Sequence, residues 1–271
     1  MELFSEDFML GNFRASDYGL IVGSFSYNGE SEDDIYIAPT VIEEFIGHNP
    51  IPIYLGQKYE NKLSLTLTVI KNPSIYFNDT YFSERELRGI LRVITGIRGY
   101  QWLKIINEEI DNDLWYRARV SNVTYKRVGG RVVGIILEMV CDSAFAWSNN
   151  NEVTIRAKAN QKFYIFNNTD DLNNYVLPLI EIVPSSAGDV VLTNATDNNW
   201  ETTINNVKAN EKITIDARKE IISSNTTHDL LLNDFNLHWI RLVPDKNEYT
   251  CNVDATITFK YRVPRKVGFT E

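Results

Sequence analysis

Apolar and polar residues alternate along most of the chain, as they do in β-strands that bury one face. Every second position is apolar from Leu63 to Val69, and the same holds from Leu114 to Val120. Successive side chains of a strand point to opposite faces of a sheet, so each run presents one continuous apolar face. These runs predict strands of an N-terminal sheet.

A long hairpin is predicted to follow the second run. The pair Gly129-Gly130 lies between two apolar segments and supplies the positive φ angles that a two-residue turn requires. The apolar positions change parity near Asn122, because Val123 and Tyr125 continue the pattern on the other face. This change predicts a β-bulge at that point.

Residues 83–98 have instead the period of an amphipathic α-helix. Ser83 and Glu86 form a capping box at its start, and Gly96 or Gly99 can end it. The apolar stripe consists of Leu87, Ile90, Leu91, Ile94 and Ile97. One helix cannot bury such a stripe alone, so we expect it to dock on a face of the N-terminal sheet.

The segment of residues 26–60 has acidic polar residues at one end and clustered apolar and proline residues at the other. A short helix is predicted to begin at Thr40, with Glu43 completing its capping box. A compact domain rarely contains so long an irregular connection unless it binds something. We therefore expect an extended arm or long hairpin that reaches a neighbouring molecule.

A polar run near residues 148–151 separates two strand-rich halves. Short strands and turns follow one another through the second half, which predicts a β-sandwich. We therefore predict a mainly β protein with two domains, residues 1–148 and residues 152–271. The first is expected to be a β-sandwich or barrel with one helix, and the second a β-sandwich.

The net charge of −9 and the isoelectric point near 5.0 argue against specific binding to nucleic acid. Proteins that grip nucleic acid are usually basic, because neutralising phosphates supplies much of their affinity. The longest apolar run, residues 132–140, is too short to span a bilayer, so we also expect no membrane partner.

The two cysteines, Cys141 and Cys251, each lie in an apolar strand pattern and in different predicted domains. We expect two buried free thiols, which is typical of folding in the cytoplasm. The N-terminal residues include acidic side chains and no basic flank, which argues against a secretory signal.

The sequence contains none of the motifs that mark a nucleotide-binding loop, a hydrolase nucleophile or a metalloprotease. The nearest approach to a metal-binding cluster is His228, Asp229, Asp234 and His238, which we interpret as turn residues, and His48 is isolated. The paired carboxylates are Asp33-Asp34, Glu108-Glu109 and Asp170-Asp171, which we interpret as solvated surface charge. We expect no catalytic, cofactor-binding or metal-binding residue, and therefore no enzyme.

Two further groups of side chains have a structural and a functional interpretation. Trp200 and Trp239 are able to stack on sugar rings, but their neighbours lack the galectin-type pattern, so a core or edge position is favoured. The arginines of the predicted helix are Arg85, Arg88, Arg92 and Arg98. They fall largely off the apolar stripe and indicate a solvated face or an interface.

Residues 10–22, LGNFRASDYGLIV, resemble the first turn and strand of distal tail proteins from long-tailed, siphovirus-type bacteriophages. The resemblance continues in residues 85–105, 114–125, 177–183, 211–222 and 240–262. It covers most of the chain, although Pro244 to Asn247 departs from the Pro-Gly that often precedes the Asn in that family. The order of the elements carries the resemblance more than any single motif does.

The resemblance implies a structural protein of the virion, located at the phage tail tip and made in the host bacterial cytoplasm. The N-terminal domain would be tail-tube-like, and the C-terminal domain would be a galectin-like β-sandwich. Six copies would form a ring under the tail tube, and this ring would be able to stack on a second one. The C-terminal domains would hold receptor-binding or other baseplate proteins, and a tail-associated hub protein would dock below. DNA would pass through the central channel, and an acidic lining would let it slide without binding.

Two alternatives belong to other functional classes. A carbohydrate-binding module that acts alone as an adhesin would be a monomer with affinity for glycans. A phage-encoded glycan hydrolase would need two carboxylates facing each other across a cleft.

Overall fold

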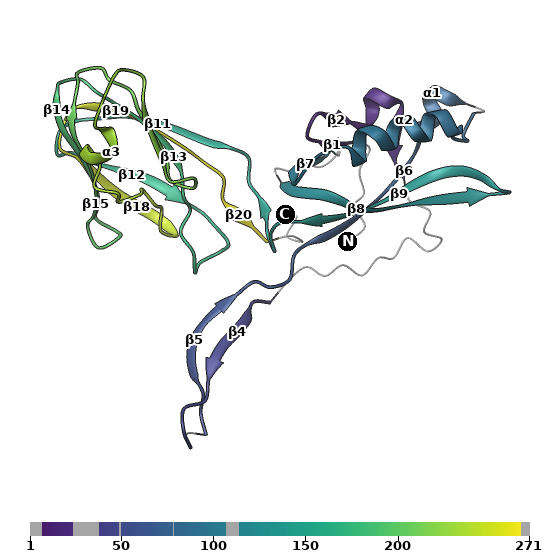
Figure 1. The fold of residues 1–271 in the computed structure, drawn as a ribbon, viewed down its shortest axis with the longest axis horizontal. Helices are drawn as coiled ribbons and strands as arrows, with labels where there is room; N and C mark the ends of the chain where they lie inside the picture. The colour runs from purple at the N-terminus through teal and green to yellow at the C-terminus, as the bar shows by residue number, and fades with distance from the viewer. Residues whose placement is uncertain (1–6, 24–37, 49, 78, 107–113, 267–271) are drawn as a thin grey trace. The chain divides into compact units, whose positions relative to one another are not determined.

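The computed structural model describes residues 7–23, 38–48, 50–77, 79–106 and 114–266 (Figure 1). The chain divides into two compact units, one of Met1–Trp147 with Lys266–Glu271 and one of Ser148–Arg265. Strands form most of both units and are arranged in several sheets. The prediction of a mainly β protein is therefore confirmed.

One antiparallel sheet dominates the first unit, with the strand order β2-β1-β7-β8-β9-β6-β3. Its strands are β1 (Asp7–Leu10), β2 (Phe13–Arg14), β3 (Leu20–Val22), β6 (Ser64–Lys71), β7 (Gln101–Ile106), β8 (Trp115–Val128) and β9 (Arg131–Cys141). The short strand β10 (Ala146–Trp147) also pairs with β8. The sheet curls, because β1 and β3 lie close together although they are far apart in the strand order.

The alternating runs form the expected strands of this sheet. Leu65, Leu67 and Val69 of β6 are buried, as are Tyr116 and Ala118 of β8. The turn between β8 and β9 has positive φ angles, 55° at Gly129 and 79° at Gly130. The register shifts between Val120 and Asn122, so the predicted hairpin and its bulge are both confirmed.

The predicted long helix is α2 (Glu84–Thr95), which lies along the sheet in Figure 1. Its capping box is present, since the Ser83 amide donates to Glu86 Oε2 at 2.7 Å and the Glu86 amide donates to Ser83 Oγ at 3.3 Å. The buried stripe residues are Leu87, Ile90 and Ile94, which share a core with the sheet. Leu91 is only half-buried, so its predicted place in the core is wrong; it faces a groove described below.

The short helix predicted at Thr40 is wrong. Residues Thr40–Glu44 form strand β4, which pairs with β5 (Ile53–Lys58) in a separate antiparallel hairpin. Three β-branched residues begin β4, and such residues lose side-chain freedom in a helix and favour strands. The hairpin expected within residues 26–60 is confirmed for its described part, while residues 24–37 and 49 lie outside the described residues.

The second unit is a β-sandwich, as the strand pattern predicted. One sheet contains β11 (Asn151–Ala157), β19 (Ala255–Tyr261), β13 (Leu179–Pro184), β16 (Ile213–Asp216) and β17 (Ile221–Ser224) in that order. The other contains β12 (Lys162–Asn167), β18 (Asp245–Cys251), β14 (Gly188–Asn194) and β15 (Trp200–Val207). Ile180 and Ile257 from the first sheet share one core with Ile165 and Leu192 from the second.

The remaining described elements are short. They are the 3₁₀ helix η1 (Ala15–Tyr18), the helices α1 (Pro73–Tyr76) and α3 (Leu231–Asp234), and the strand β20 (Pro264–Arg265). Within the part of the chain that the structure describes, no helix is long and apolar enough to cross a membrane.

Both cysteines are buried free thiols, as expected, and they lie in different units. Burial, together with the neighbouring Asp142 carboxylate, raises the pKa of the Cys141 thiol to about 12. Burial also raises the pKa of the Cys251 thiol. Because the thiolate is the reactive form, both cysteines serve as packing residues.

Candidate functional site

The hairpin of β4 and β5, which we call the arm, exposes an unusual amount of apolar surface. Its exposed apolar side chains are Val41, Ile42, Phe45, Ile46, Ile51, Ile53, Tyr54 and Leu55. Their exposed fractions run from 39% for Ile42 to 71% for Ile51. A large contiguous apolar surface marks an interaction site, and an isolated hairpin is only marginally stable in water.

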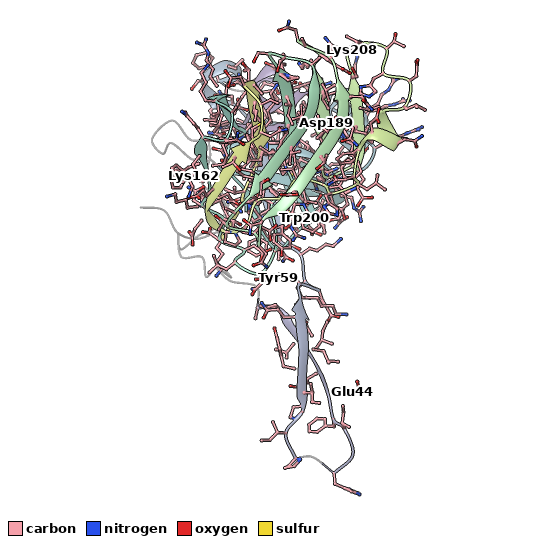
Figure 2. All side chains as sticks on the ribbon, turned by 90° about the vertical axis from the view of Figure 1, so that its left-hand side faces the viewer. Glu44, Tyr59, Lys162, Asp189, Trp200 and Lys208 are labelled. Carbon is pink, nitrogen blue, oxygen red and sulfur yellow. The ribbon has the colours of Figure 1, made fainter. Side chains whose placement is uncertain are left out.

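The register of the arm explains its local shape. Thr40 pairs with Lys58 and Glu44 with Ile53, and the register shifts between Ile42 and Glu43. Such a bulge increases the twist of a ribbon and discourages further strands from joining its edge. Figure 2 shows the arm as a narrow two-stranded ribbon, with Glu44 at the end of β4 near the turn. The arm therefore offers its side chains, rather than a flat edge, to another surface.

A groove lies between α2 and the hairpin of β8 and β9, with a cavity volume of about 490 Å³. It is lined by Glu84, Leu87, Arg88, Leu91, Arg92, Thr95, Tyr125 and Arg127. The arginines of the helix are exposed, as the sequence predicted for a solvated face or an interface. The groove combines apolar side chains with three arginines and one glutamate, so its lining has a net positive charge, and we call it the basic groove.

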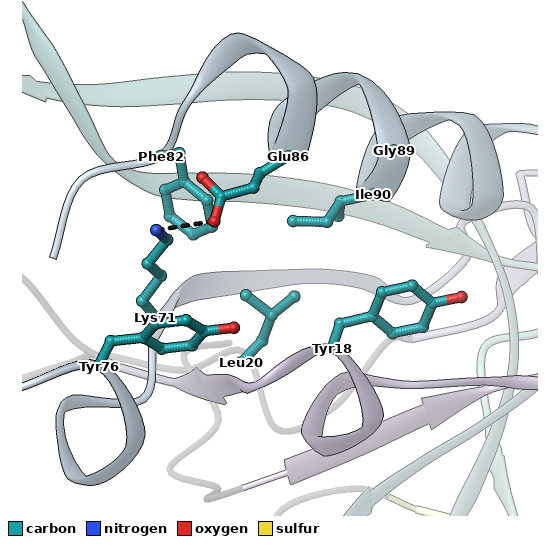
Figure 3. A pocket seen from close by; sticks show the side chains of 8 residues that line it. All are labelled: Tyr18, Leu20, Lys71, Tyr76, Phe82, Glu86, Gly89 and Ile90. Atoms are coloured by element: carbon teal, nitrogen blue, oxygen red, sulfur yellow. Dashed lines mark ion pairs between the residues drawn. The ribbon is translucent and has the colours of Figure 1, made fainter. Parts of the chain in front are cut away.

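A second, smaller cavity of about 240 Å³ lies at the start of α2 and contains the buried amine of Lys71 (Figure 3). The Lys71 Nζ atom is 2.9 Å from Glu86 Oε1 and 3.0 Å from Asp79 Oδ2. It also lies 4.9 Å from the centre of the Tyr76 ring. The charge of this lysine is thus fully compensated within the unit.

The charged groups of this cavity have a structural role. Burial alone would raise the pKa of Glu86, but hydrogen bonds from Lys71 and Ser83 lower it to about 2. Burial would lower the pKa of Lys71, and its bonds to Glu86 and Asp79 raise it instead. Glu86 therefore caps α2 and ties the helix to β6 through Lys71, so the glutamate and the lysine are both engaged with protein groups.

The structure brings together only part of the histidine and aspartate cluster noted in the sequence. His228 Nε2 lies 2.9 Å from Asp234 Oδ2, and its Nδ1 lies 2.9 Å from Oε1 of Glu211. Glu211 does not stand out in the sequence as a member of this cluster, because it lies 17 positions before His228 on another turn. His238 stacks on Trp200 instead, and Asp229 is not part of the cluster.

These side chains fasten the loop before α3 to the turn between β15 and β16. Ser224 Oγ donates to Glu211 at 2.6 Å, and Asn206 donates to Asp234 at 2.9 Å. Hydrogen bonds to Asp234 and then to Glu211 raise the pKa of His228 against the effect of burial. Every polar atom of the cluster thus has a structural partner, which favours a fastening role.

The carboxylate pairs do not form an acid and base couple in the described residues. Asp171 accepts from the Asn173 amide and the Asn174 side chain, while Asp170 lies 3.7 Å from Arg265. Asp33-Asp34 and Glu108-Glu109 lie outside the described residues. Among the described residues, no group of three or more His, Cys, Asp or Glu side chains is arranged to hold a metal ion. His48 is exposed in the turn of the arm.

The two tryptophans considered for sugar binding are engaged with protein groups. The His238 ring stacks on Trp200 at 4.5 Å between ring centres, and the Arg241 guanidinium lies 4.0 Å from the Trp200 ring. Trp200 also donates its indole N–H to the Trp239 carbonyl at 3.1 Å. Trp239 packs against Phe235 and the sandwich core. Both tryptophans thus have the edge-and-core positions that the sequence favoured.

Two protein-family models match the chain over almost its whole length. Residues 4–143 match a phage tail protein N-terminal domain, and residues 145–261 match a phage tail C-terminal domain. The chain belongs to this phage tail protein family. The protein is therefore a structural component of a phage tail, as its resemblance to distal tail proteins implied.

Solved structures with a similar fold come from phage tails as well. The Dit (gp 19.1) protein of phage SPP1, described as a paradigm of the hub adsorption apparatus in phages infecting Gram-positive hosts, has a TM-score of 0.64 and 15% identity. That match covers 94% of this chain and 98% of the SPP1 protein. None of the curated proteins matches the chain by sequence.

A chain of the phage P2 baseplate, in its activated conformation with Ca, has a TM-score of 0.53 and 8% identity. That match covers 98% of this chain and the full length of the P2 chain. The same baseplate with Sr gives a TM-score of 0.50 at 9% identity, over 97% of this chain and 99% of that one. These identities are low, so the likeness is one of fold, and it confirms the distal-tail-like fold expected from the sequence.

Proposed function

We propose that this phage tail protein forms a ring of six copies at the tip of the tail. The observation that carries the proposal is the arm, whose apolar side chains are exposed in the single copy. A surface of this kind is stabilised when another molecule covers it. In a closed cyclic ring each contact is head to tail, so the arm of one copy meets a different surface on the next.

The two units have different roles at the tail tip. The first, residues 1–148, forms the ring, stacks under the tail tube and surrounds a channel through which DNA passes. The second, residues 152–271, is a galectin-like sandwich that holds receptor-binding or other baseplate proteins, while the hub protein docks below. The net charge of −9 supports passage of DNA without retention. The protein acts in the virion as a scaffold, not as an enzyme, and the number six comes from the resemblance to distal tail proteins.

A stand-alone sugar-binding adhesin has less support. Such a module needs an aromatic ring free to stack on a sugar, and Trp200 is already contacted by His238 and Arg241.

Sedimentation velocity of the full chain at micromolar concentration tests the ring. We expect a species of about six times the monomer mass, formed alone or with the tail-tube and hub proteins of the same phage. Replacing residues 40–58 by a short Gly-Ser linker should leave a monomer. The control is Leu230→Ser with Leu232→Ser, which removes exposed apolar surface from the second unit, and it should assemble normally. A full chain that stays monomeric even with those proteins would refute the proposal.

A further inference from the structure

The arm carries negative charge that no described residue of its own copy neutralises. Glu43 and Glu44 end β4 and are exposed, and neither forms an ion pair with any residue the structure describes. Neighbouring residues of a strand point to opposite faces, so one carboxylate lies on each face of the ribbon. Phe45 and Ile46 follow directly and are 63% and 58% exposed. The end of β4 is thus acidic on both faces and apolar beyond.

The basic groove has the opposite character. Arg88 and Arg92 lie one turn apart on α2 and form one wall, while Arg127 of β8 belongs to the other. Within the described ranges, neither helix arginine has an acidic partner, and Arg127 bonds only the Gly130 carbonyl and stacks on Tyr125. Two unpaired like charges one turn apart repel each other, so an incoming carboxylate would relieve that repulsion.

The floor of the groove suits the apolar residues at the end of the arm. Half-buried Leu91 and exposed Tyr125 line it between the arginines. Its volume of about 490 Å³ falls in the range of concave ligand sites and leaves room for more than one side chain. A ribbon inserted between the two walls would present one face to each of them.

We propose that the end of β4 in one copy, from Glu43 to Ile46, docks in the basic groove of a second copy. This inference rests on the proposed ring and names the surface that receives the arm. One carboxylate pairs with Arg88 and Arg92 on α2, and the other, on the opposite face of the ribbon, pairs with Arg127. The apolar pair covers Leu91 and Tyr125. The occupant is a second copy because the complementary segment is part of the same chain, and head-to-tail contacts of this kind close a ring.

Charge exchange in the full chain tests the docking. The groove variant is Arg88→Glu with Arg92→Glu, the arm variant is Glu43→Arg with Glu44→Arg, and the third variant combines all four changes. We expect each double variant to weaken assembly about tenfold or more, and the combination to recover most of that loss. The matched control is Arg85→Glu with Arg98→Glu, which makes the same charge change on exposed arginines outside the groove lining and should assemble normally.

Cysteine cross-linking provides a second test, which does not depend on how strongly the copies assemble. The native thiols of Cys141 and Cys251 are buried, so introduced cysteines should react selectively. A mixture of Glu44→Cys protein and Arg92→Cys protein should give a covalent pair of the two chains under mild oxidation. Neither variant alone should give a disulfide-linked pair of chains. A mixture of Glu44→Cys protein with Arg98→Cys protein should not give one either.

The results of these experiments distinguish an error in the docking site from an error in the proposed ring. If the full chain assembles and the armless chain does not, but charge reversal in the groove changes nothing, the docking site is wrong and the ring stands. If both reversals weaken assembly and the combination restores nothing, the arm and groove meet other surfaces and the inference is overturned. Cross-linking within one copy that carries both cysteines, without any between copies, would also overturn it. A chain that never assembles refutes the ring and the docking together.

Discussion

His228 is held by a carboxylate on each of its ring nitrogens, so its charged form, which donates from both, fits the site best. The raised pKa of His228 means that this stabilisation is complete below its usual pKa of about 6.5 and is lost as the pH rises through the raised value. The lowered pKa values of Glu211 and Asp234 mean that it is also lost when acid protonates them. The fastening is therefore strongest at mildly acidic pH.

We predict that His228→Gln destabilises the second unit by about 1–3 kcal/mol at pH 6 and by clearly less at pH 9. The neutral amide cannot supply the positive charge, and at pH 9 the native histidine has lost more of that charge too. Urea unfolding, followed by the hydrogen exchange of peptides from the second unit, measures the difference. An equal loss at both pH values would mean that the charge of His228 contributes nothing.

At the scale of single residues, the sequence predicted those contacts and buried positions that depend on residues close together along the chain. Ser83 and Glu86 are three positions apart, and the buried faces of β6 and β8 follow from simple alternation, so pattern alone identified them. Glu211 was missed because its contact with His228 depends on two turns meeting in space. The engagement of Trp200 was missed for the same reason, since its partners become neighbours only in the folded sandwich.

Local backbone conformation contributes to the stability of the main elements. Two glycines, one in a helix and one in a turn, allow this contribution to be measured. Gly89 lies within α2, and a Cβ atom built there would meet nothing within 4 Å. Gly129 has a φ of 55° in the turn between β8 and β9, and a Cβ atom there would also meet nothing. Crowding is therefore absent at both sites, and only the backbone conformation distinguishes them.

We predict that Gly89→Ala stabilises the first unit by about 0.5–1 kcal/mol, because alanine loses less entropy in a helix. Gly129→Ala should destabilise the same unit by about 1–2 kcal/mol, because an L-residue is strained at that φ angle. Hydrogen exchange of peptides from α2 and from the β8–β9 hairpin reports both effects in one protein. Opposite signs are required; a shift in the same direction for both variants would contradict the account.

The arm shows where prediction by element fails. Residues 40–44 satisfy a capping pattern, but their β-branched side chains pair with residues 53–58 across a turn. The sequence pattern of a short segment does not show whether the segment will pair with a distant strand or form a helix. Expecting a long hairpin within residues 26–60 succeeded because it used the length and composition of the whole segment.

At the scale of the whole molecule, the two units have separate hydrophobic cores. We predict that a fragment of residues 148–265 folds on its own and unfolds in a single cooperative transition. Near-ultraviolet circular dichroism of the fragment, compared with the full chain, is the measurement. A fragment that lacks fixed tertiary structure would show that the sandwich depends on the rest of the chain and that the proposed domains are not independent.

Electron microscopy of the purified full chain shows whether the protein forms the proposed ring. Class averages of negatively stained particles, prepared alone and with the tail-tube and hub proteins, reveal both the number of copies and any central opening. We expect closed rings of six copies around an open channel, and we expect no rings when residues 40–58 are replaced by a linker. Single copies, or assemblies without a central channel, under both conditions would contradict it.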